Sequence, residues 1–210
     1  MQLVLASNNA KKLIELQRLF AGLPVELVAQ GALQIGEADE PHGTFVENAL
    51  AKARHAAAQA GGAAIADDSG LCVDALGGEP GVVSAHYAPL LADGSDDREA
   101  LRRRQDAANT AMLLQRMRDV NDRRARFVST LVALRHAEDP EPLVTVGRWN
   151  LELLHEPRGN GGFGYDPIVW VPTHRCSVAE LDASVKNAIS HRALAAQQMR
   201  SLMREVWRHG

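Results

Sequence analysis

The sequence ADDSGL occupies residues 66–71 and follows a short apolar run, AAI, at residues 63–65. The apolar run predicts a buried strand, and Asp67 and Asp68 then place two adjacent carboxylates where that strand ends. Paired carboxylates at such a place are costly unless a cation lies beside them. Carboxylate oxygens suit a hard cation such as Mg²⁺, which keeps most of its waters and is commonly shared with phosphate groups. The stretch therefore indicates a metal site, although an Asp-Ser-Gly turn with carboxylates bonded to backbone N–H groups remains the alternative.

Composition limits the class of protein. With 210 residues, of which 46% are apolar, the chain can bury one sizeable core, and we expect a single domain over residues 1–210. The net charge of −3 argues against binding to nucleic acid or to an anionic membrane surface. Cys72 and Cys176 lie far apart without a metal-ligand spacing, which favours reduced thiols in the cytoplasm. No segment resembles a signal sequence or an apolar span of about 18 residues, so we expect a soluble protein that is not exported.

Lysine is scarce in this chain. Basic residues number 23, and only four of them are lysines, namely Lys11, Lys12, Lys52 and Lys186. A chain that otherwise uses arginine keeps lysine where a compact, flexible charge is needed. Each of the four lysines lies in a segment that other features of the sequence also mark.

A polar loop, SNNAKK at residues 7–12, separates a strand-like run at residues 3–6 from a helix expected over residues 11–20. Backbone N–H groups and the helix dipole favour a phosphate at such a helix start. Lysine is normally disfavoured at this end of a helix, so Lys11 and Lys12 indicate an anion nearby. The alternative is an Asn or Ser N-cap with two solvated lysines.

Two further helices are expected. The capping-box pattern Thr44-x-x-Glu47 opens an alanine-rich helix that ends at residues 61–62. Glu47 is therefore expected to cap this helix, and metal contact by Glu40 or Glu47 is the alternative. Another helix is expected over residues 95–117, where an Asp-rich start precedes a helical apolar pattern.

Strand signals are clearest in the second half of the chain. Residues 125–136 and 142–154 are two long β-rich runs joined by EDPE at residues 138–141, which predicts a hairpin. Both faces of the first run are largely apolar, so both faces require cover. We expect part of that cover to come from a second copy of the chain, and hence a homodimer.

The sequence GNGGFGYDP at residues 159–167 contains the spacing G-x-G-x-x-G. A dinucleotide-binding fingerprint requires a helix directly after that spacing, whereas Pro167 and a β-rich run follow here. The glycines beside Phe163 and Tyr165 instead indicate a loop that brings backbone and aromatic faces to a flat ligand, with Asp166 as a hydrogen-bond acceptor. A glycine-rich turn around buried aromatic side chains is the alternative.

The sequence KNAISHR at residues 186–192 is expected to open the last helix. Lys186, His191 and Arg192 would then place three potential cations at a helix start, where cations are unfavourable. They indicate an anion or a set of acceptor atoms, and a solvated basic turn is the alternative. The chain contains no G-x-x-x-x-G-K-[ST], G-x-S-x-G or H-E-x-x-H motif, which excludes the P-loop, α/β-hydrolase and zincin classes.

Six motifs occur in order along the chain: Ser7-x-Asn9-x-x-Lys12, Phe45-x-Glu47-Asn48-Ala49-x-x-Lys52-Ala53, Ala66-Asp67-Asp68-Ser69-Gly70-Leu71, Gly77-Gly78-x-Pro80-Gly81, Gly162-Phe163-Gly164-Tyr165-Asp166-Pro167 and Ile189-Ser190-His191-Arg192. Together they resemble the noncanonical purine nucleoside triphosphate pyrophosphatases, the inosine triphosphate pyrophosphatase family, over essentially the whole chain. The resemblance implies an α/β fold with an elongated central mixed β-sheet flanked by helices, and two lobes with the active-site cleft between them. It also implies a homodimeric, Mg²⁺-dependent enzyme that hydrolyses ITP, dITP and XTP to the monophosphate and pyrophosphate.

The resemblance also assigns roles to matching positions. The triphosphate loop would comprise Ser7, Asn8, Asn9, Ala10, Lys11 and Lys12. The base and sugar pocket would comprise Phe163, Gly164, Tyr165, Asp166, Lys186, His191 and Arg192. Asp68 would act as general base and metal ligand, Ser69 as a substrate contact and Glu40 as a second metal ligand. Two positions depart from the family's pattern: His86 replaces the usual Arg, which makes any phosphate contact there weaker and pH-dependent, and Leu151 stands where Gly is common.

Two alternatives to this assignment remain. A Maf-like nucleotide pyrophosphatase also begins its phosphate loop with Leu-Ala-Ser, as residues 5–7 do here, but it lacks the Phe-Gly-Tyr-Asp and Ser-His-Arg segments. A non-catalytic nucleotide sensor would bind the same triphosphate without hydrolysing it. In each case the expected partner is a small-molecule nucleoside triphosphate.

Overall fold

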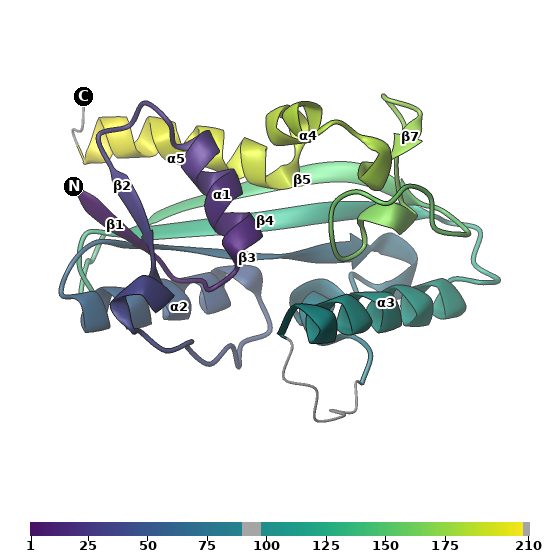
Figure 1. Ribbon diagram of the computed structural model, residues 1–210, viewed down its shortest axis with the longest axis horizontal. Helices are drawn as coiled ribbons and strands as arrows, with labels where there is room; N and C mark the ends of the chain where they lie inside the picture. The colour runs from purple at the N-terminus through teal and green to yellow at the C-terminus, as the bar shows by residue number, and fades with distance from the viewer. Residues whose placement is uncertain (90–97, 208–210) are drawn as a thin grey trace. The chain divides into compact units, whose positions relative to one another are not determined.

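The computed structural model describes residues 1–89 and 98–207. Its helices and strands, in chain order, are β1 Gln2–Leu5, α1 Ala10–Leu19, β2 Glu26–Ala29, α2 Phe45–Ala60, β3 Ala64–Val73, α3 Arg98–Arg116, β4 Arg124–Leu134, β5 Leu143–Leu153, β6 Val169–Val171, β7 Cys176–Ser177, α4 Ala183–Ile189 and α5 His191–Val206 (Figure 1). The chain divides into two compact units. Unit 1 comprises Met1–Asp68, Ser129–Arg148 and Asn187–Gly210, and unit 2 comprises Ser69–Val128 and Trp149–Lys186.

The strands form one mixed sheet. In the described part of the chain its order is β2-β1-β3-β4-β5-β6-β7. Strand β1 pairs in parallel with β2 and β3, whereas β6 pairs antiparallel with β5 and β7. A mixed sheet flanked by helices confirms the expected α/β class. The expectation of a single domain stays a prediction.

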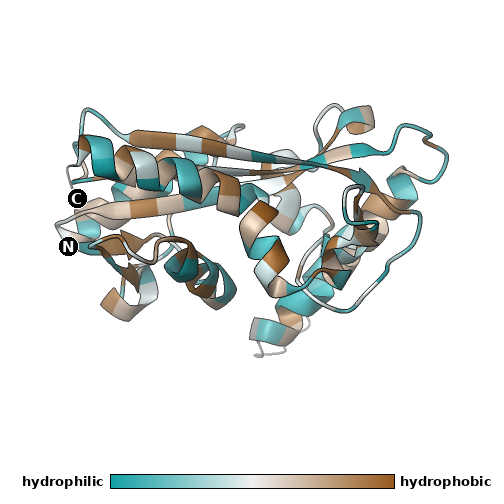
Figure 2. Cartoon of the chain, turned by 90° about the horizontal axis from the view of Figure 1, so that it is seen from above, coloured by the Kyte–Doolittle hydropathy of each residue, from teal (hydrophilic) through white to brown (hydrophobic). Residues whose placement is uncertain are grey.

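The core of unit 1 consists of two apolar clusters, one on each face of its strands. Leu3 of β1 packs in the first cluster with Leu16 of α1 and Met199 of α5. Val4, the next residue of β1, packs in the second cluster with Ala53 of α2, because successive side chains of a strand point to opposite faces. Figure 1 accordingly shows α1 and α5 on one side of these strands and α2 on the other. Figure 2 shows hydrophilic and hydrophobic residues mixed along the helices, as expected for helices that bury one face.

Strand β3 overturns one expectation. The apolar run was expected to end before Asp67, with a turn at Asp-Ser-Gly as the alternative, but the strand continues through both carboxylates as far as Val73. Asp67 is 1% exposed and Asp68 is 6% exposed. A buried strand can carry two adjacent carboxylates only where cationic groups compensate them, and these groups are described below.

The predicted hairpin is confirmed as β4 and β5. Strand β4 is buried at almost every position, whereas β5 alternates buried and exposed residues. Leu131 of β4 packs in the first cluster of unit 1 and Val132 packs in the second. Helices of this chain therefore cover both faces of β4 in unit 1. The apolar faces do not require a second subunit, and the homodimer stays a prediction.

The ends of the helices follow local signals. Thr44 is the N-cap of α2, and Gly61, with φ of 63°, ends this helix in the left-handed region. Helix α3 is confirmed from Arg98 onward, whereas its expected start at residues 95–97 lies outside the described residues. Lys186 does not open the last helix: it lies in α4, and α5 begins separately after its N-cap Ser190. No helix among residues 1–89 and 98–207 is long and apolar enough to cross a membrane.

Candidate active site

Asp67 is a buried carboxylate of unit 1 that contacts two cations. Its Oδ2 lies 2.9 Å from Lys12 Nζ and 3.1 Å from Arg192 Nε, and its Oδ1 accepts a hydrogen bond of 2.7 Å from Ser129 Oγ. Burial alone would raise the pKa of Asp67. The charges of Lys12 and Arg192 outweigh burial and hold that pKa well below its usual value. Asp67 is therefore a permanent anion that fixes two cations.

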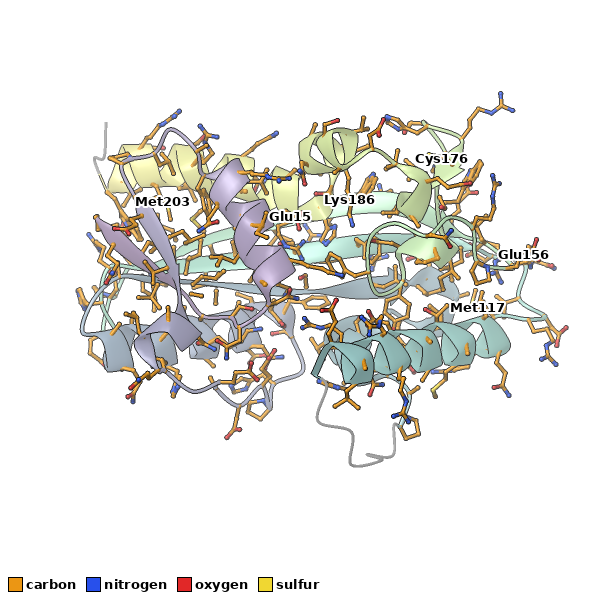
Figure 3. The ribbon with its side chains drawn as sticks, viewed as in Figure 1. Glu15, Met117, Glu156, Cys176, Lys186 and Met203 are labelled. Atoms are coloured by element: carbon orange, nitrogen blue, oxygen red, sulfur yellow. The ribbon has the colours of Figure 1, made fainter. Side chains whose placement is uncertain are left out.

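Arg192 is held from both sides. The side chain is 2% exposed, and its NH1 lies 2.5 Å from Glu15 Oε2, opposite the contact with Asp67. Burial opposes the charged guanidinium, but Asp67 and Glu15 together raise its pKa. Glu15 comes from α1 and is labelled in Figure 3. Arg192 thus connects the start of α5 to α1 and β3 through charge pairs within unit 1.

Asp68 has a different environment from its neighbour. Lys52 Nζ, on α2, lies 2.8 Å from Asp68 Oδ1 and 2.8 Å from Glu40 Oε2. The other oxygen of Asp68, Oδ2, is buried and has no hydrogen-bond partner among the described residues. Burial raises the pKa of Asp68 to about 6, Lys52 opposes this rise and Glu40 adds to it. Asp68 can therefore exchange a proton near neutral pH, and one of its oxygens is available for a ligand.

The donor set fits Mg²⁺ in the way that phosphate-handling sites bind it. Mg²⁺ is usually held by one or two carboxylates and completes its shell with water and phosphate oxygens. Asp68 Oδ2 and the Glu40 carboxylate supply such oxygens on the two sides of Lys52. The described residues contain no cluster of three or more Asp, Glu, His or Cys side chains that could hold a metal alone. Water and the phosphate oxygens of a ligand would complete the shell of a metal held by these two carboxylates.

The polar loop before α1 shows the Asn N-cap of the second alternative, and its role in phosphate binding stays a prediction. Asn9 is the N-cap of α1, and its Oδ1 accepts hydrogen bonds of 3.0 Å from Lys11 N and 3.2 Å from Lys12 N. Ser7 Oγ accepts a hydrogen bond of 3.1 Å from Asn9 N, and Asn8 Nδ2 donates to Glu37 at 3.1 Å. Ala10 is the first residue of α1, and Lys11 is exposed. Lys12 is not merely solvated, because its ammonium lies against Asp67.

In the glycine-rich loop of unit 2, a carboxylate accepts a hydrogen bond from a backbone N–H group. Asp166 Oδ2 accepts a hydrogen bond of 2.9 Å from Phe163 N and lies 2.6 Å from Lys186 Nζ. The same ammonium lies 4.8 Å from the centroid of the Phe163 ring. Figure 3 labels Lys186, which projects from α4. A Cβ on Gly162, which has φ of 74°, would lie 2.0 Å from Asp166 Oδ2, so this position requires glycine.

The segment after this loop confirms that it is no dinucleotide fingerprint. A three-residue 3₁₀ turn, Asp166–Ile168, and strand β6 follow the glycines, so no α-helix begins there. Tyr165 is buried, and its hydroxyl donates to the Ser84 carbonyl at 2.9 Å. The two aromatic side chains therefore differ: the Phe163 ring contacts the Lys186 ammonium, whereas the buried Tyr165 is hydrogen-bonded to the backbone of unit 2.

The predicted site residues fall into two groups. Unit 1 contains residues 7–12, Glu40, Asp68, His191 and Arg192, with His191 buried as the first residue of α5. Unit 2 contains Ser69, half-buried in β3, together with residues 163–166 and Lys186.

Two residues of the unit 1 cluster, Lys52 and Glu15, were missed as site residues. Asp67 was expected as one of a metal-binding pair, and its carboxylate lies against Lys12 and Arg192. The scarcity of lysine was a signal for Lys52, and the Asp-Asp pair was a signal for Asp67. The sequence gave no signal for Glu15, because an acidic residue one turn into an amphipathic helix is ordinarily solvated. Its partner Arg192 lies 177 residues further along the chain.

The fold and these clusters define a mixed α/β protein with a buried acidic pair held by lysine and arginine. The model of the Ham1 family matches residues 3–202, and the chain therefore belongs to the Ham1 family. This match confirms the resemblance that the six motifs indicate.

Individual relatives agree with this assignment. The chain is 67% identical over 207 residues to a dITP/XTP pyrophosphatase of Methylibium petroleiphilum, covering 99% of both chains. It is 65% identical to a dITP/XTP pyrophosphatase of Leptothrix cholodnii, again covering 99% of both chains. Among solved structures, a HAM1 protein from Coxiella burnetii superposes with a TM-score of 0.86 at 41% identity, covering 98% of this chain and 100% of that chain. A nucleoside-triphosphatase / dITP/XTP pyrophosphatase from Mycobacterium abscessus gives a TM-score of 0.71 at 40% identity, covering 95% and 98%.

Proposed function

We propose that this protein hydrolyses the noncanonical purine nucleoside triphosphates ITP, dITP and XTP to the nucleoside monophosphate and pyrophosphate, and so cleanses the nucleotide pool. The observation that carries the proposal is the buried Asp67–Asp68 pair with Lys12 and Lys52 bound to it. Relatives named dITP/XTP pyrophosphatase match nearly the whole length of this chain at up to 67% identity. The chain therefore acts as a hydrolase of a phosphoric anhydride.

In the proposed reaction, a carboxylate acts as the general base and lysine side chains supply positive charge. Water attacks the α-phosphorus, the bond from that phosphorus to the bridging oxygen breaks, and pyrophosphate leaves. Asp68 Oδ2 accepts the proton of the attacking water, and its pKa of about 6 keeps it ionised at pH 7. Lys52 holds the other oxygen at 2.8 Å and so fixes the orientation of the carboxylate. Asp67 remains charged, and its role is to position Lys12.

The phosphate chain is assigned to unit 1. Lys12, and the loop of Ser7, Asn8, Asn9, Ala10 and Lys11 before and around the start of α1, supply positive charge and polar groups for phosphate oxygens. Mg²⁺, when bound by Asp68 and Glu40, supplies further charge neutralisation at the phosphates. Phosphoryl transfer depends mainly on such positioning and neutralisation, so a cluster of this kind is sufficient for catalysis.

The base is assigned to unit 2. The Phe163 ring offers a stacking face, and Lys186 lies beside it as a donor. Hypoxanthine and xanthine present an acceptor oxygen at position 6, whereas adenine presents an amino donor, so a donor here favours the first two bases. Gly164, Tyr165 and Asp166 shape this pocket, and Ser69 contacts the substrate beside Asp68. Arg192 and His191 are secondary contacts in this proposal, because Arg192 already pairs with Asp67 and Glu15.

Pyrophosphate release from ITP with added Mg²⁺ tests the proposal. We expect release from ITP, dITP and XTP, little release from ATP, and none when the metal is chelated. A protein that binds ITP without releasing pyrophosphate would be the nucleotide sensor. The Maf-like alternative receives no support, because the matching family is Ham1.

The remaining expectations concern partners and location. We propose a cytoplasmic homodimer that binds neither nucleic acid nor membranes. The net charge of −3 supports the absence of bulk binding to polyanions. Light scattering at micromolar concentration tests the assembly, and a monomer there would contradict the homodimer.

A further inference from the structure

The polar face of α3 holds two other segments of unit 2. Asp106 Oδ2 accepts a hydrogen bond of 3.0 Å from Gly164 N in the glycine-rich loop at residues 159–167, which is called the aromatic loop below. One turn further, Asn109 is 2% exposed, and its Nδ2 donates to the carbonyls of Ser84 and Ala85 at 3.2 and 3.1 Å. The Ser84 carbonyl also accepts from the Tyr165 hydroxyl. Helix α3 therefore reaches the aromatic loop by two routes, one direct through Asp106 and one through Ser84.

Three backbone N–H groups of the aromatic loop are already used. Gly161 N donates to the Ala179 carbonyl at 3.1 Å, Phe163 N donates to Asp166, and Gly164 N donates to Asp106. These donors cannot also face a bound base.

Gly164 has little else to fix its position. Its φ of 62° lies in the left-handed region, and a Cβ built there would meet no atom within 4 Å. Glycine in open space has many accessible conformations, so a hydrogen bond from its N–H selects one of them. Phe163 precedes this residue directly, and the plane of its ring depends on the backbone angles that Asp106 and Asp166 hold from either side of the peptide.

We infer that Asp106 is a positioning residue for purine recognition, which fixes the Phe163 ring through the Gly164 N–H. The inference rests on the proposed function, because it assumes that the base binds at Phe163 and Lys186. Asp106 itself need not touch the substrate. The acceptor oxygen, not the negative charge, carries the effect, since the donor is a neutral amide.

Three variants distinguish the loss of the hydrogen-bond acceptor at Asp106 from a general effect on folding. Asp106→Ala removes the acceptor, and Asp106→Asn retains one at Oδ1. Glu99→Ala is the matched control, because it removes a carboxylate of the same helix whose ion pair is with Arg103 on that helix. We expect Asp106→Ala to raise the KM for ITP and XTP on the order of tenfold with a smaller change in kcat. The ratio of kcat/KM for these two substrates to kcat/KM for ATP should fall as well. Asp106→Asn and Glu99→Ala should stay within about twofold of the unsubstituted protein.

Calorimetric titration with inosine monophosphate makes the test independent of turnover. Asp106→Ala should weaken this binding on the order of tenfold, and Asp106→Asn should restore most of it. Unchanged affinity in Asp106→Ala, or a loss shared equally by ITP, XTP and ATP, would overturn the inference. Absence of any binding by the unsubstituted protein would overturn it as well. An unsubstituted protein that binds inosine monophosphate but hydrolyses no triphosphate would instead contradict the proposed function.

Discussion

Two groups of carboxylates in this molecule differ in the partners that hold them. In unit 1, Asp67 and Asp68 are bound by the side-chain cations Lys12 and Lys52, and Asp67 is bound by Arg192 as well. In unit 2, Asp106 and Asp166 accept hydrogen bonds from backbone N–H groups of the aromatic loop, and Asp166 also pairs with Lys186. In the proposed function, the first arrangement concentrates charge that acts on the phosphates of any triphosphate. The second fixes the shape of a loop, which acts only on a ligand that fits it. The proposed function thus assigns chemistry to the first arrangement and selectivity to the second.

Asp68→Asn should give the largest effect on the unit 1 arrangement. The amide cannot accept the proton of water, so kcat should fall roughly 10²–10⁴-fold for every accepted triphosphate. Steady-state pyrophosphate release measures the loss, and a melting curve shows whether the fold is retained. Near-normal turnover in a folded Asp68→Asn protein would remove Asp68 from the mechanism.

Asp67→Ala should act on stability. This change removes the carboxylate that pairs with Lys12 and leaves the buried Arg192, which is 2% exposed, with Glu15 as its remaining anion in this cluster. Breaking one side of a buried charge pair costs about 3–5 kcal/mol, so the free energy of unfolding should fall by about that amount in denaturant titrations. Asp122→Ala is the control, because it breaks an exposed pair with Arg124 and should leave the midpoint unchanged. Equal midpoints for both variants would show that Asp67 is not the organising anion.

The pH dependence of activity should give a smaller effect. A raised carboxyl pKa of about 6 means that Asp68 is protonated, and inactive as a base, below that pH. At low Mg²⁺ concentration, kcat/KM should therefore fall about tenfold per pH unit below pH 6. More Mg²⁺ should move this acidic limb to lower pH, because a bound cation favours the ionised carboxylate. If the fall in kcat/KM at acidic pH does not depend on the Mg²⁺ concentration, Asp68 is not a ligand of the metal.

Local signals in the sequence were sufficient for most of the fold. The cap at Thr44, the Gly61 terminus and the hairpin of β4 and β5 depend on residues close together in the chain, and the structure confirms all three. The motifs also marked Asp68 and the loop at residues 162–166. These features need no knowledge of distant partners.

The misjudged features depend on distant partners. Asp-Asp-Ser-Gly has the composition of a turn. A buried strand is possible here because Lys52 pairs with Asp68, and because Lys12, 55 residues away, and Arg192, 125 residues away, pair with Asp67. Gly147 in β5 was also overlooked. A Cβ there would lie 1.9 Å from the His191 carbonyl oxygen, so this glycine lets β5 approach the start of α5.

The most direct test of the separation compares two lysines, one from each unit. We measure kcat/KM for ITP, XTP and ATP with Lys12→Met and Lys186→Met. Lys12 acts on phosphate, so Lys12→Met should depress all three triphosphates by the same factor. Lys186 acts on the base, so Lys186→Met should lose activity chiefly on ITP and XTP, where a missing hydrogen bond at about 1–3 kcal/mol corresponds to roughly ten- to hundredfold. Equal losses across the three bases for both variants would place Lys186 on the phosphate chain and contradict the account.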